Sequence, residues 1–174
     1  ASVSDAARLN SITCAAPTKS FNIAGLQIAN IIVPDNDMRT RIDRAININE
    51  VCDVNPFGVE ALIAAYNEGE EWLSQLLAYL KGNDDFMWDF CRQNLPQFPL
   101  TRLEGTYLEW MDCKTIGLAS AELEKRLIDE AGLWLNAGTM YGAEGEGFMR
   151  WNIACPRSRL TEGLERFRQY ISSL

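Results

Sequence analysis

Two short apolar runs near the start of the sequence constrain the fold more than any other feature. They are residues 11–17 (SITCAAP) and 26–34 (LQIANIIVP), both rich in β-branched or other apolar side chains and both closed by a proline. Runs of this length and composition are typical of strands that are buried on both faces. Because such strands need neighbours, we expect a mixed α/β chain in which other strands and layers cover them.

The rest of the chain alternates predicted helices and strands. The longest helical pattern spans residues 55–83, with Asn55 as its cap, Pro56 in its first turn, and Gly82 and Asn83 at its end. Its length is typical of a spine between two lobes. Further helices are predicted within 35–51 and at 84–96, 120–132 (with Ser120 as cap and Gly132 as stop) and 159–174, and further strands at 105–113, 133–136 and 148–154.

Composition narrows the classes of protein to consider. The chain has 174 residues, of which 47% are apolar, enough for a real core. Its 16 basic and 24 acidic residues give a net charge of -8, which disfavours nucleic acid and anionic membrane surfaces as partners. No apolar run reaches the length of about 18 residues that spans a bilayer, and the first residues lack the pattern of a signal peptide. We therefore expect a cytoplasmic protein.

Cysteine and histidine usage limits the chemistry further. The five cysteines are odd in number and form no CxxC pair, so neither a disulfide framework nor a zinc site is indicated, and buried thiols are expected at Cys14, Cys52, Cys91, Cys113 and Cys155. The sequence has no histidine, which excludes Ser–His and Cys–His nucleophiles and histidine-bearing metal sites within this chain. Catalysis would have to use lysine, tyrosine, carboxylates or a cofactor.

The strand at 148–154 follows a glycine-rich stretch, residues 138–147. The glycine-rich stretch contains Glu144 and Glu146 and leads into a strand, so it is expected to be a tight connection rather than a phosphate cradle. Along the strand, a period of two puts Arg150 and Asn152 on one face and Trp151 on the other. A guanidinium beside an amide can receive a carboxylate through parallel hydrogen bonds; the alternative is an ordinary structural ion pair.

Lys19 lies between the two apolar runs. A lysine in this setting is commonly a surface residue with its ammonium group in water. The alternative is a partly buried lysine, whose pKa is lowered and which can form a Schiff base with a cofactor aldehyde such as pyridoxal phosphate. Thr18 would offer a hydroxyl beside it, and Gly25 would let the backbone approach a bulky neighbour.

Three separated segments, in order and at plausible spacing, resemble a known family. They are 16–27 (APTKSFNIAGLQ), 104–113 (EGTYLEWMDC) and 147–167 (GFMRWNIACPRSRLTEGLERF). The first is similar to the cofactor-lysine segment of class I/II pyridoxal-phosphate enzymes. All three resemble the C–S lyase group that includes cystathionine β-lyases and the MalY/PatB-type proteins.

The resemblance implies a fold and a domain organisation. Residues 1–50 would be the tail of the large domain of a fold type I enzyme, including the Schiff-base lysine. Residues 51–174 would be the interdomain helix and a small C-terminal α+β domain, whose antiparallel-rich sheet is flanked by helices. Family members are about twice as long and form dimers, so this chain would lack the N-terminal half and would be nearly inactive alone.

The resemblance also assigns roles to residues. Lys19 would carry pyridoxal 5′-phosphate, with Thr18 near the cofactor phosphate. Gln27 stands where related aminotransferases have a phosphate-binding arginine, a departure that favours elimination over transamination. Arg150, with Asn152 beside it, would bind the α-carboxylate of an amino-acid substrate.

The function implied is a C–S β-lyase that converts cystathionine- or cysteine-type amino acids to a thiol, pyruvate and ammonia. The first alternative is a class I/II aminotransferase acting in amino-acid metabolism. A second alternative, of a different class, is a non-catalytic dimerisation or interaction module, because apolar strands without neighbours seek a partner chain.

Overall fold

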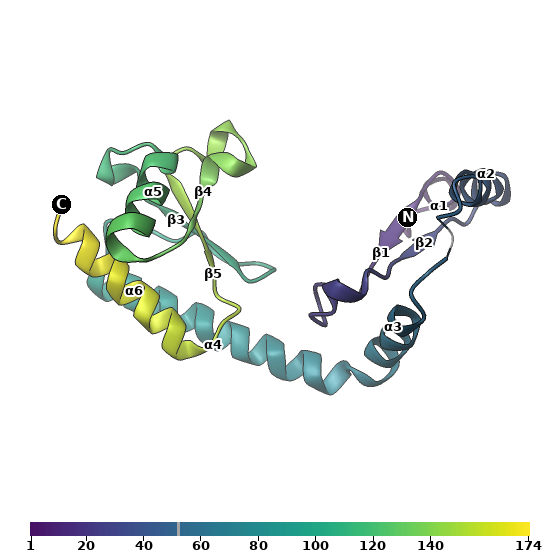
Figure 1. Ribbon diagram of the computed structural model, residues 1–174, viewed down its shortest axis with the longest axis horizontal. Coiled ribbons are helices and arrows are strands. Elements are labelled where there is room, and N and C mark those ends of the chain that lie inside the picture. Colours follow the sequence, from purple (N-terminus) through teal and green to yellow (C-terminus); the bar gives the residue numbers. More distant parts are fainter. Residues whose placement is uncertain (52) are drawn as a thin grey trace. The chain divides into compact units, whose positions relative to one another are not determined.

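A computed structural model describes residues 1–51 and 53–174 (Figure 1). They form two compact units, Ala1–Gln75 and Leu76–Leu174. No helix in the described part of the chain is both long and apolar enough to cross a membrane.

The N-terminal unit contains a two-stranded antiparallel ribbon and short helices. Its elements are α1 (Asp5–Leu9), β1 (Thr13–Ala15), the 3₁₀ helix η1 (Ala24–Leu26), β2 (Asn30–Ile32), α2 (Asn36–Asn47), α3 (Pro56–Glu68) and the first turns of α4 (Glu70–Asn94). Both predicted strands are therefore confirmed, as is the helix predicted within 35–51, which Asp35 caps by accepting a hydrogen bond from the Met38 amide at 2.8 Å.

The predicted burial of these strands on both faces is wrong. Ile31 and Ile32 of β2 are 49% and 51% exposed. The reason is topological: β1 and β2 pair only with each other, with Cys14 opposite Ile31, and no third strand extends this ribbon among the described residues. A ribbon of two strands cannot cover its own apolar side chains.

The long helix predicted at 55–83 is divided, and its predicted end is wrong. Asn55 does cap α3, since its Oδ1 accepts a hydrogen bond from the Phe57 amide at 3.1 Å, and Pro56 is the first helical residue. The division falls at Gly69, where a Cβ atom would collide with the ring of Phe21. The chain then continues as α4, so the predicted helix at 84–96 is the second part of α4.

Asn83 does not end the helix because its side chain is fully satisfied by distant groups. Its Nδ2 donates to the carbonyl oxygens of Ile153 at 2.7 Å and Cys155 at 3.0 Å, and its Oδ1 accepts from Nε of Arg157 at 2.7 Å. Asparagine has a low intrinsic helix propensity, but a buried side-chain amide whose donors and acceptor are all hydrogen-bonded stabilises the helical position. Asn83 thus fastens α4 to the chain just after β5 (Phe148–Asn152).

Replacing Asn83 with alanine is expected to lower the free energy of unfolding by about 2 kcal/mol, because it leaves two buried carbonyls and one guanidinium N–H unpaired. Urea denaturation followed by circular dichroism measures this change. Asn94→Ala is the matched control, since the Asn94 amide donates only to Phe90 of its own helix and is exposed. Equal destabilisation by the two variants would contradict the assigned role of Asn83.

The C-terminal unit has a three-stranded antiparallel sheet with helices packed against it. The strand order is β3–β5–β4, with β3 at Leu108–Asp112 and β4 at Asn136–Ala137. The remaining elements are α5 (Ser120–Ala131), α6 (Arg157–Ile171) and three 3₁₀ helices, η2 (Lys114–Ile116), η3 (Gly138–Tyr141) and η4 (Ala143–Gly145). This confirms the predicted antiparallel-rich sheet flanked by helices, and Figure 1 shows α5 and α6 beside it.

The core of this unit lies between one face of the sheet and the helices. Met111, Met149 and Trp151 supply the sheet face, and the ring of Phe167 from α6 packs edge-on against Trp151 with centroids 5.7 Å apart. The predicted alternation of β5 is confirmed, because Met149 and Trp151 are buried while Arg150 is half-buried on the opposite face. Leu174, predicted on the apolar face of the last helix, is exposed because α6 ends at Ile171.

The N-terminus of α5 shows a second local correction. Ser120 is the first helical residue rather than the cap; its amide donates to Oε1 of Glu146 at 2.7 Å, and its Oγ accepts from the Gly147 amide at 2.7 Å. The bond from the Ser120 amide lowers the pKa of the Glu146 carboxyl. Gly132 ends the helix in the left-handed conformation, as predicted. The glycine-rich stretch is the tight connection expected, because Gly138 packs directly against the backbone of Gly145.

The thiol predictions are confirmed in part. Cys91 and Cys113 are buried, and burial is the main reason that the pKa of each rises to about 12. Cys155 is half-buried, whereas Cys14 is exposed because nothing in its unit covers β1. Cys52 lies outside the described residues.

Candidate functional site

Lys19 lies in a turn that follows β1. The turn is closed by hydrogen bonds from the Phe21 amide to the Pro17 carbonyl at 2.9 Å and from the Ile23 amide to the Thr18 carbonyl at 3.1 Å. Asn22 takes a left-handed conformation, with φ of 55°, that lets the chain reverse. The fold therefore holds the Lys19 backbone in a defined turn while leaving its side chain exposed.

Aromatic packing fixes this turn to the helices of its own unit. The Phe21 ring stacks on Trp72 at 6.0 Å and meets Tyr66 edge-on at 6.3 Å. The absence of a side chain at Gly69 makes room for this ring. Because Phe21 is two residues after Lys19, this packing restricts the position of the Lys19 backbone, from which its side chain extends.

The amine of Lys19 differs from those of the other three lysines in the sequence. Lys81 pairs with Asp84 and Asp85, Lys114 with Asp112, and Lys125 with Asp129. Lys19 has no acidic partner among the residues that the structure describes. Of the two alternatives that the sequence left open, a surface lysine and a partly buried one, Lys19 is the exposed lysine in this chain. What remains is an amine not held in an ion pair.

The neighbouring predicted residues lie around the same turn and η1. Thr18 is half-buried, and Gln27 is exposed in a left-handed conformation at the end of η1. Gly25 has open space where a Cβ would lie, so the close approach expected there is not found among the described residues. The close approach occurs instead at Gly58 of α3, whose Cβ would lie 3.0 Å from the Leu26 carbonyl oxygen. Gly58 was missed because only the fold brings α3 against η1.

Arg150 lies at the centre of the sheet in the C-terminal unit. It is opposite Trp110 on β3 and opposite Asn136 on β4. Its Nη2 donates to Oδ1 of Asn136, and its guanidinium carbon lies 4.5 Å from the centroid of the Tyr141 ring. Trp110 in turn meets Tyr141 edge-on at 5.5 Å. The guanidinium is therefore held from two sides by uncharged groups.

The charge of Arg150 has no acidic partner in the described part of the chain. None of the ion pairs found there includes Arg150, and its Nε is buried without a hydrogen-bond partner. The ordinary structural ion pair, the alternative left open by the sequence, is thus not found among these residues. A positioned guanidinium with an unfilled donor is suited to bind a carboxylate.

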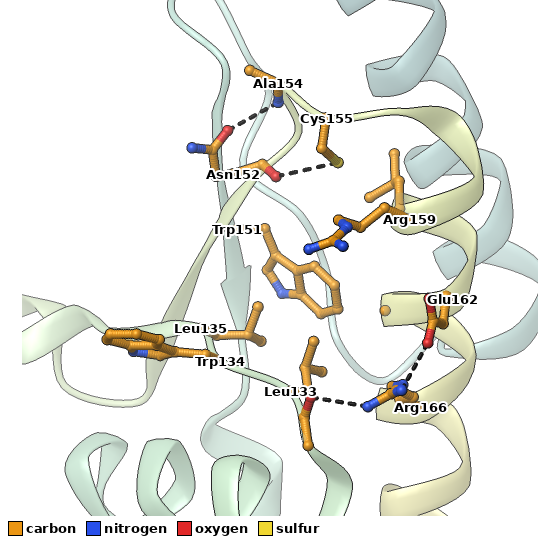
Figure 2. A pocket seen from close by; sticks show the side chains of 13 residues that line it. Leu133, Trp134, Leu135, Trp151, Asn152, Ala154, Cys155, Arg159, Glu162 and Arg166 are labelled. Atoms are coloured by element: carbon orange, nitrogen blue, oxygen red, sulfur yellow. Dashed lines mark hydrogen bonds and ion pairs between the residues drawn. The ribbon is translucent and has the colours of Figure 1, made fainter. Parts of the chain in front are cut away.

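Asn152 lies on the same face of β5 as Arg150, as predicted, but its amide oxygen is engaged locally. Oδ1 accepts a hydrogen bond from the Ala154 amide at 2.9 Å. Asn152 also lines a pocket of about 510 Å³ formed with Trp151, Cys155 and Arg159, and Arg150 is not among the lining residues. Figure 2 shows the Asn152 amide turned toward Ala154 at the edge of this pocket.

Sequence reasoning missed two residues that orient Arg150. Asn136 and Tyr141 contact its guanidinium, and both come from the segment between α5 and β5. The pairing of β4 with β5 puts Asn136 opposite Arg150. This contact could have been predicted only if the register of the two strands had been known. Lys19 and Arg150 belong to separate units, so the structure describes the surroundings of each by itself.

No group of three or more His, Cys, Asp or Glu side chains in residues 1–51 and 53–174 is arranged to hold a metal ion. The candidate functional groups are two, each described within its own unit: the Lys19 turn, and the Arg150 face of the sheet, which is defined by Trp110, Asn136, Tyr141 and Arg150.

The chain is similar to known proteins along most of its length. It is 40% identical over 172 residues to cystathionine beta-lyase PatB of Bacillus subtilis, covering 99% of this chain and 44% of PatB. It is 33% identical over 148 residues to protein MalY of Escherichia coli, covering 84% of this chain and 38% of MalY. The structure matches that of cystalysin from Treponema denticola, which contains a pyridoxal 5′-phosphate cofactor, with a TM-score of 0.93 and 30% identity over 99% of this chain and 44% of cystalysin.

These matches bear on the predicted relation between this chain and its family. The chain spans less than half the length of the relatives it matches, which confirms the difference in size expected from the resemblance. The family model described as aminotransferase class I and II matches residues 2–167. The chain belongs to the aminotransferase class I and II family.

Proposed function

We propose that the complete protein is a pyridoxal-phosphate-dependent C–S β-lyase, which cleaves cystathionine- or cysteine-type amino acids to a thiol, pyruvate and ammonia. The observation that carries the proposal is the 40% identity to a cystathionine β-lyase over nearly the whole chain. The amine of Lys19 and the guanidinium of Arg150 support it, since neither forms an ion pair with the residues that the structure describes and the reaction needs both charges available.

The residues present fit the two ends of a cofactor–substrate pair. Lys19 offers an exposed primary amine beside the hydroxyl of Thr18, with Gln27 on the same segment, and these residues would hold the cofactor. When bound, pyridoxal phosphate supplies an electron sink for the negative charge that develops at the substrate Cα. The groups that tune its ring would come from outside these 174 residues, so we propose that this chain alone is nearly inactive.

The roles of the chain's own residues follow from their chemistry. Lys19 would anchor the cofactor covalently and then carry the proton to and from Cα. Arg150 would bind the substrate α-carboxylate and thereby fix which bond at Cα is broken. Asn136 and Tyr141 would keep the guanidinium in place before the substrate arrives.

The domain organisation and assembly belong to the same proposal. Residues 1–50 would complete the large cofactor-binding domain, and residues 51–174 would form the interdomain helix and small domain. The complete protein would be a cytoplasmic homodimer, as the sequence leads us to expect.

Transamination is the second candidate function, and the family description favours it. In that reaction the proton removed from Cα would be returned to the cofactor instead, and the amino group would pass to a keto acid. Gln27 in place of a phosphate-binding arginine supports elimination. A non-catalytic interaction module is the third candidate, supported by the exposed apolar side chains of β2, Ile31 and Ile32.

One assay of the full-length protein distinguishes the three candidates. Incubated with cystathionine and pyridoxal phosphate but without a keto acid, a lyase releases pyruvate and free thiol in equal amounts. An aminotransferase releases neither, and converts the amino acid only when a keto acid is added. An interaction module is inactive in both arms. Absence of pyruvate without added keto acid would refute the lyase proposal.

A further inference from the structure

Two carboxyl groups meet inside the C-terminal unit, away from the Arg150 face of the sheet. Glu109 of β3 is 0% exposed, and neither of its carboxyl oxygens has a hydrogen-bond partner among the side chains and backbone described. Asp84 of α4 is 8% exposed, and its Oδ1 is likewise buried without such a partner. Glu109 as an unpaired, buried carboxylate beside a second carboxylate would be strongly destabilising.

The position of Glu109 explains why water does not solvate it. It alternates with Trp110 along β3, so it points into the core face while Trp110 lies on the Arg150 face. Its partner in the register is Trp151 of β5, whose indole N–H is also buried and unpaired. Glu109 therefore lies on the core face of the sheet, out of contact with water.

The charged and titratable groups around Glu109 come mainly from α4. Asp84 lies within hydrogen-bonding reach, Lys81 donates to the other oxygen of Asp84 at 3.2 Å, and the buried thiol of Cys91 lies nearby. The same face of β5 carries Met149 and Trp151, which do not titrate. From α6, Arg157 is engaged by Asn83. Lys81, the cation of the group, is more than half exposed and forms ion pairs with Asp84 and with the exposed Asp85.

We propose that Asp84 and Glu109 share one proton, so that a hydrogen bond between a neutral carboxyl and a carboxylate locks α4 to the sheet that carries Arg150. The shared proton gives the pair a donor, which two carboxylates lack, and pairs two of the three oxygens that otherwise have no partner. Like-charged carboxyl groups at one site behave this way because both cannot ionise together.

Asn83, which precedes Asp84 on α4, connects the proposed carboxyl pair to the strand that carries Arg150. Asn83 holds the carbonyls that follow β5, and Asp84 reaches β3, so one turn of α4 secures both long strands of the sheet. Arg150 lies on β5, opposite Trp110 of β3. Loss of the shared proton would place two negative charges beneath this pair of strands.

The direction of the pH dependence follows from the electrostatics. Burial, and then the hydrogen bond and charge of Asp84, raise the pKa of Glu109 from 4.5 to about 8 in the folded protein. A raised folded-state pKa means that the contribution to stability is complete below the ordinary glutamate pKa and is lost as the pH rises to about 8. The unit should therefore weaken in mildly alkaline solution.

The test compares the 174-residue chain with its Glu109→Gln variant from about pH 5 to about pH 9. Glutamine keeps the shape and can donate a hydrogen bond to Asp84 without titrating. We expect the unfolding equilibrium constant of the wild type to rise with pH on the order of a hundred-fold more than that of the variant. Glu104→Gln, at an exposed position just before β3, is the matched control and should follow the wild type.

Infrared spectroscopy provides an independent measurement that does not depend on unfolding. The wild type should show the band of a protonated carboxyl group at neutral pH, which Glu109→Gln removes and Glu104→Gln keeps. Asp84→Asn should shift the loss of this band to lower pH, because it removes the like charge. Parallel stability curves for the wild type and Glu109→Gln, or no protonated-carboxyl band in the wild type at neutral pH, would overturn the proposal.

Discussion

Alanine in place of Lys19 is expected to lower kcat/KM of the full-length protein for thiol release at least about a thousand-fold. The change would remove both the proposed covalent anchor of the cofactor and the group proposed to transfer the Cα proton. Folding should be unaffected, because the side chain is exposed and makes no ion pair with the described residues. Steady-state kinetics with cystathionine, together with thermal unfolding of the same preparations, measure the two effects separately.

Lys125→Ala is the matched control for this variant. Lys125 is an exposed lysine whose ion pair with Asp129 lies on the surface of α5, where such pairs contribute little to stability. Its activity should stay within about two-fold of the wild type. If Lys19→Ala retained activity comparable to that of Lys125→Ala, the amine of Lys19 would have no part in the reaction.

Replacing Arg150 with alanine is expected to lower kcat/KM about a hundred-fold or more, because the α-carboxylate loses a charged, hydrogen-bonded partner. Arg150→Lys should recover only part of this loss, since an ammonium group cannot reproduce the planar pair of donors. Arg150→Ala should lose the preference for cystathionine over its α-carboxamide, which lacks the negative charge, whereas Arg150→Lys, which keeps a cation, should retain part of it. This loss of discrimination separates carboxylate binding from a purely structural role.

Asn136→Ala gives a graded comparison in the same experiment. Asn136 accepts a hydrogen bond from the guanidinium and is assigned no contact with the substrate, so its loss should reduce kcat/KM about ten-fold or less while keeping the preference for a charged carboxylate. Arg92→Ala, which removes an exposed ion pair with Asp89, should leave activity unchanged. Retained preference for cystathionine over the carboxamide in Arg150→Ala would mean that another group binds the carboxylate.

Local patterns predicted the elements of the fold but not all of their limits. The alternation of Met149, Arg150 and Trp151 correctly gave the two faces of β5, because the period of a strand is fixed by its backbone. The end of the long helix was misplaced because Gly82 and Asn83 have low intrinsic helix propensity. The hydrogen bonds that Asn83 makes to distant residues compensate for this, and the helix continues. Tertiary hydrogen bonds override local propensity at Asn83, and Phe21 selects Gly69 as the break.

The candidate site shows the same division. Lys19 and Arg150 could be singled out from the sequence because their segments resemble a family and their residue types suit its chemistry. Asn136 and Tyr141 could not, since they reach Arg150 through the pairing of β4 with β5. The burial of both Asp84 and Glu109 was also beyond reach, because it depends on the tertiary packing around two residues with no local relation.

The most direct test of the proposed function is to find the residue that carries the cofactor. The full-length protein is incubated with pyridoxal phosphate, reduced with borohydride to make the attachment permanent, digested, and mapped by mass spectrometry. We predict a single phosphopyridoxyl group on Lys19 and none on Lys19→Ala. Attachment to Lys81, Lys114 or Lys125 instead, or equal labelling of the Lys19→Ala variant, would contradict the assignment of Lys19 as the cofactor anchor.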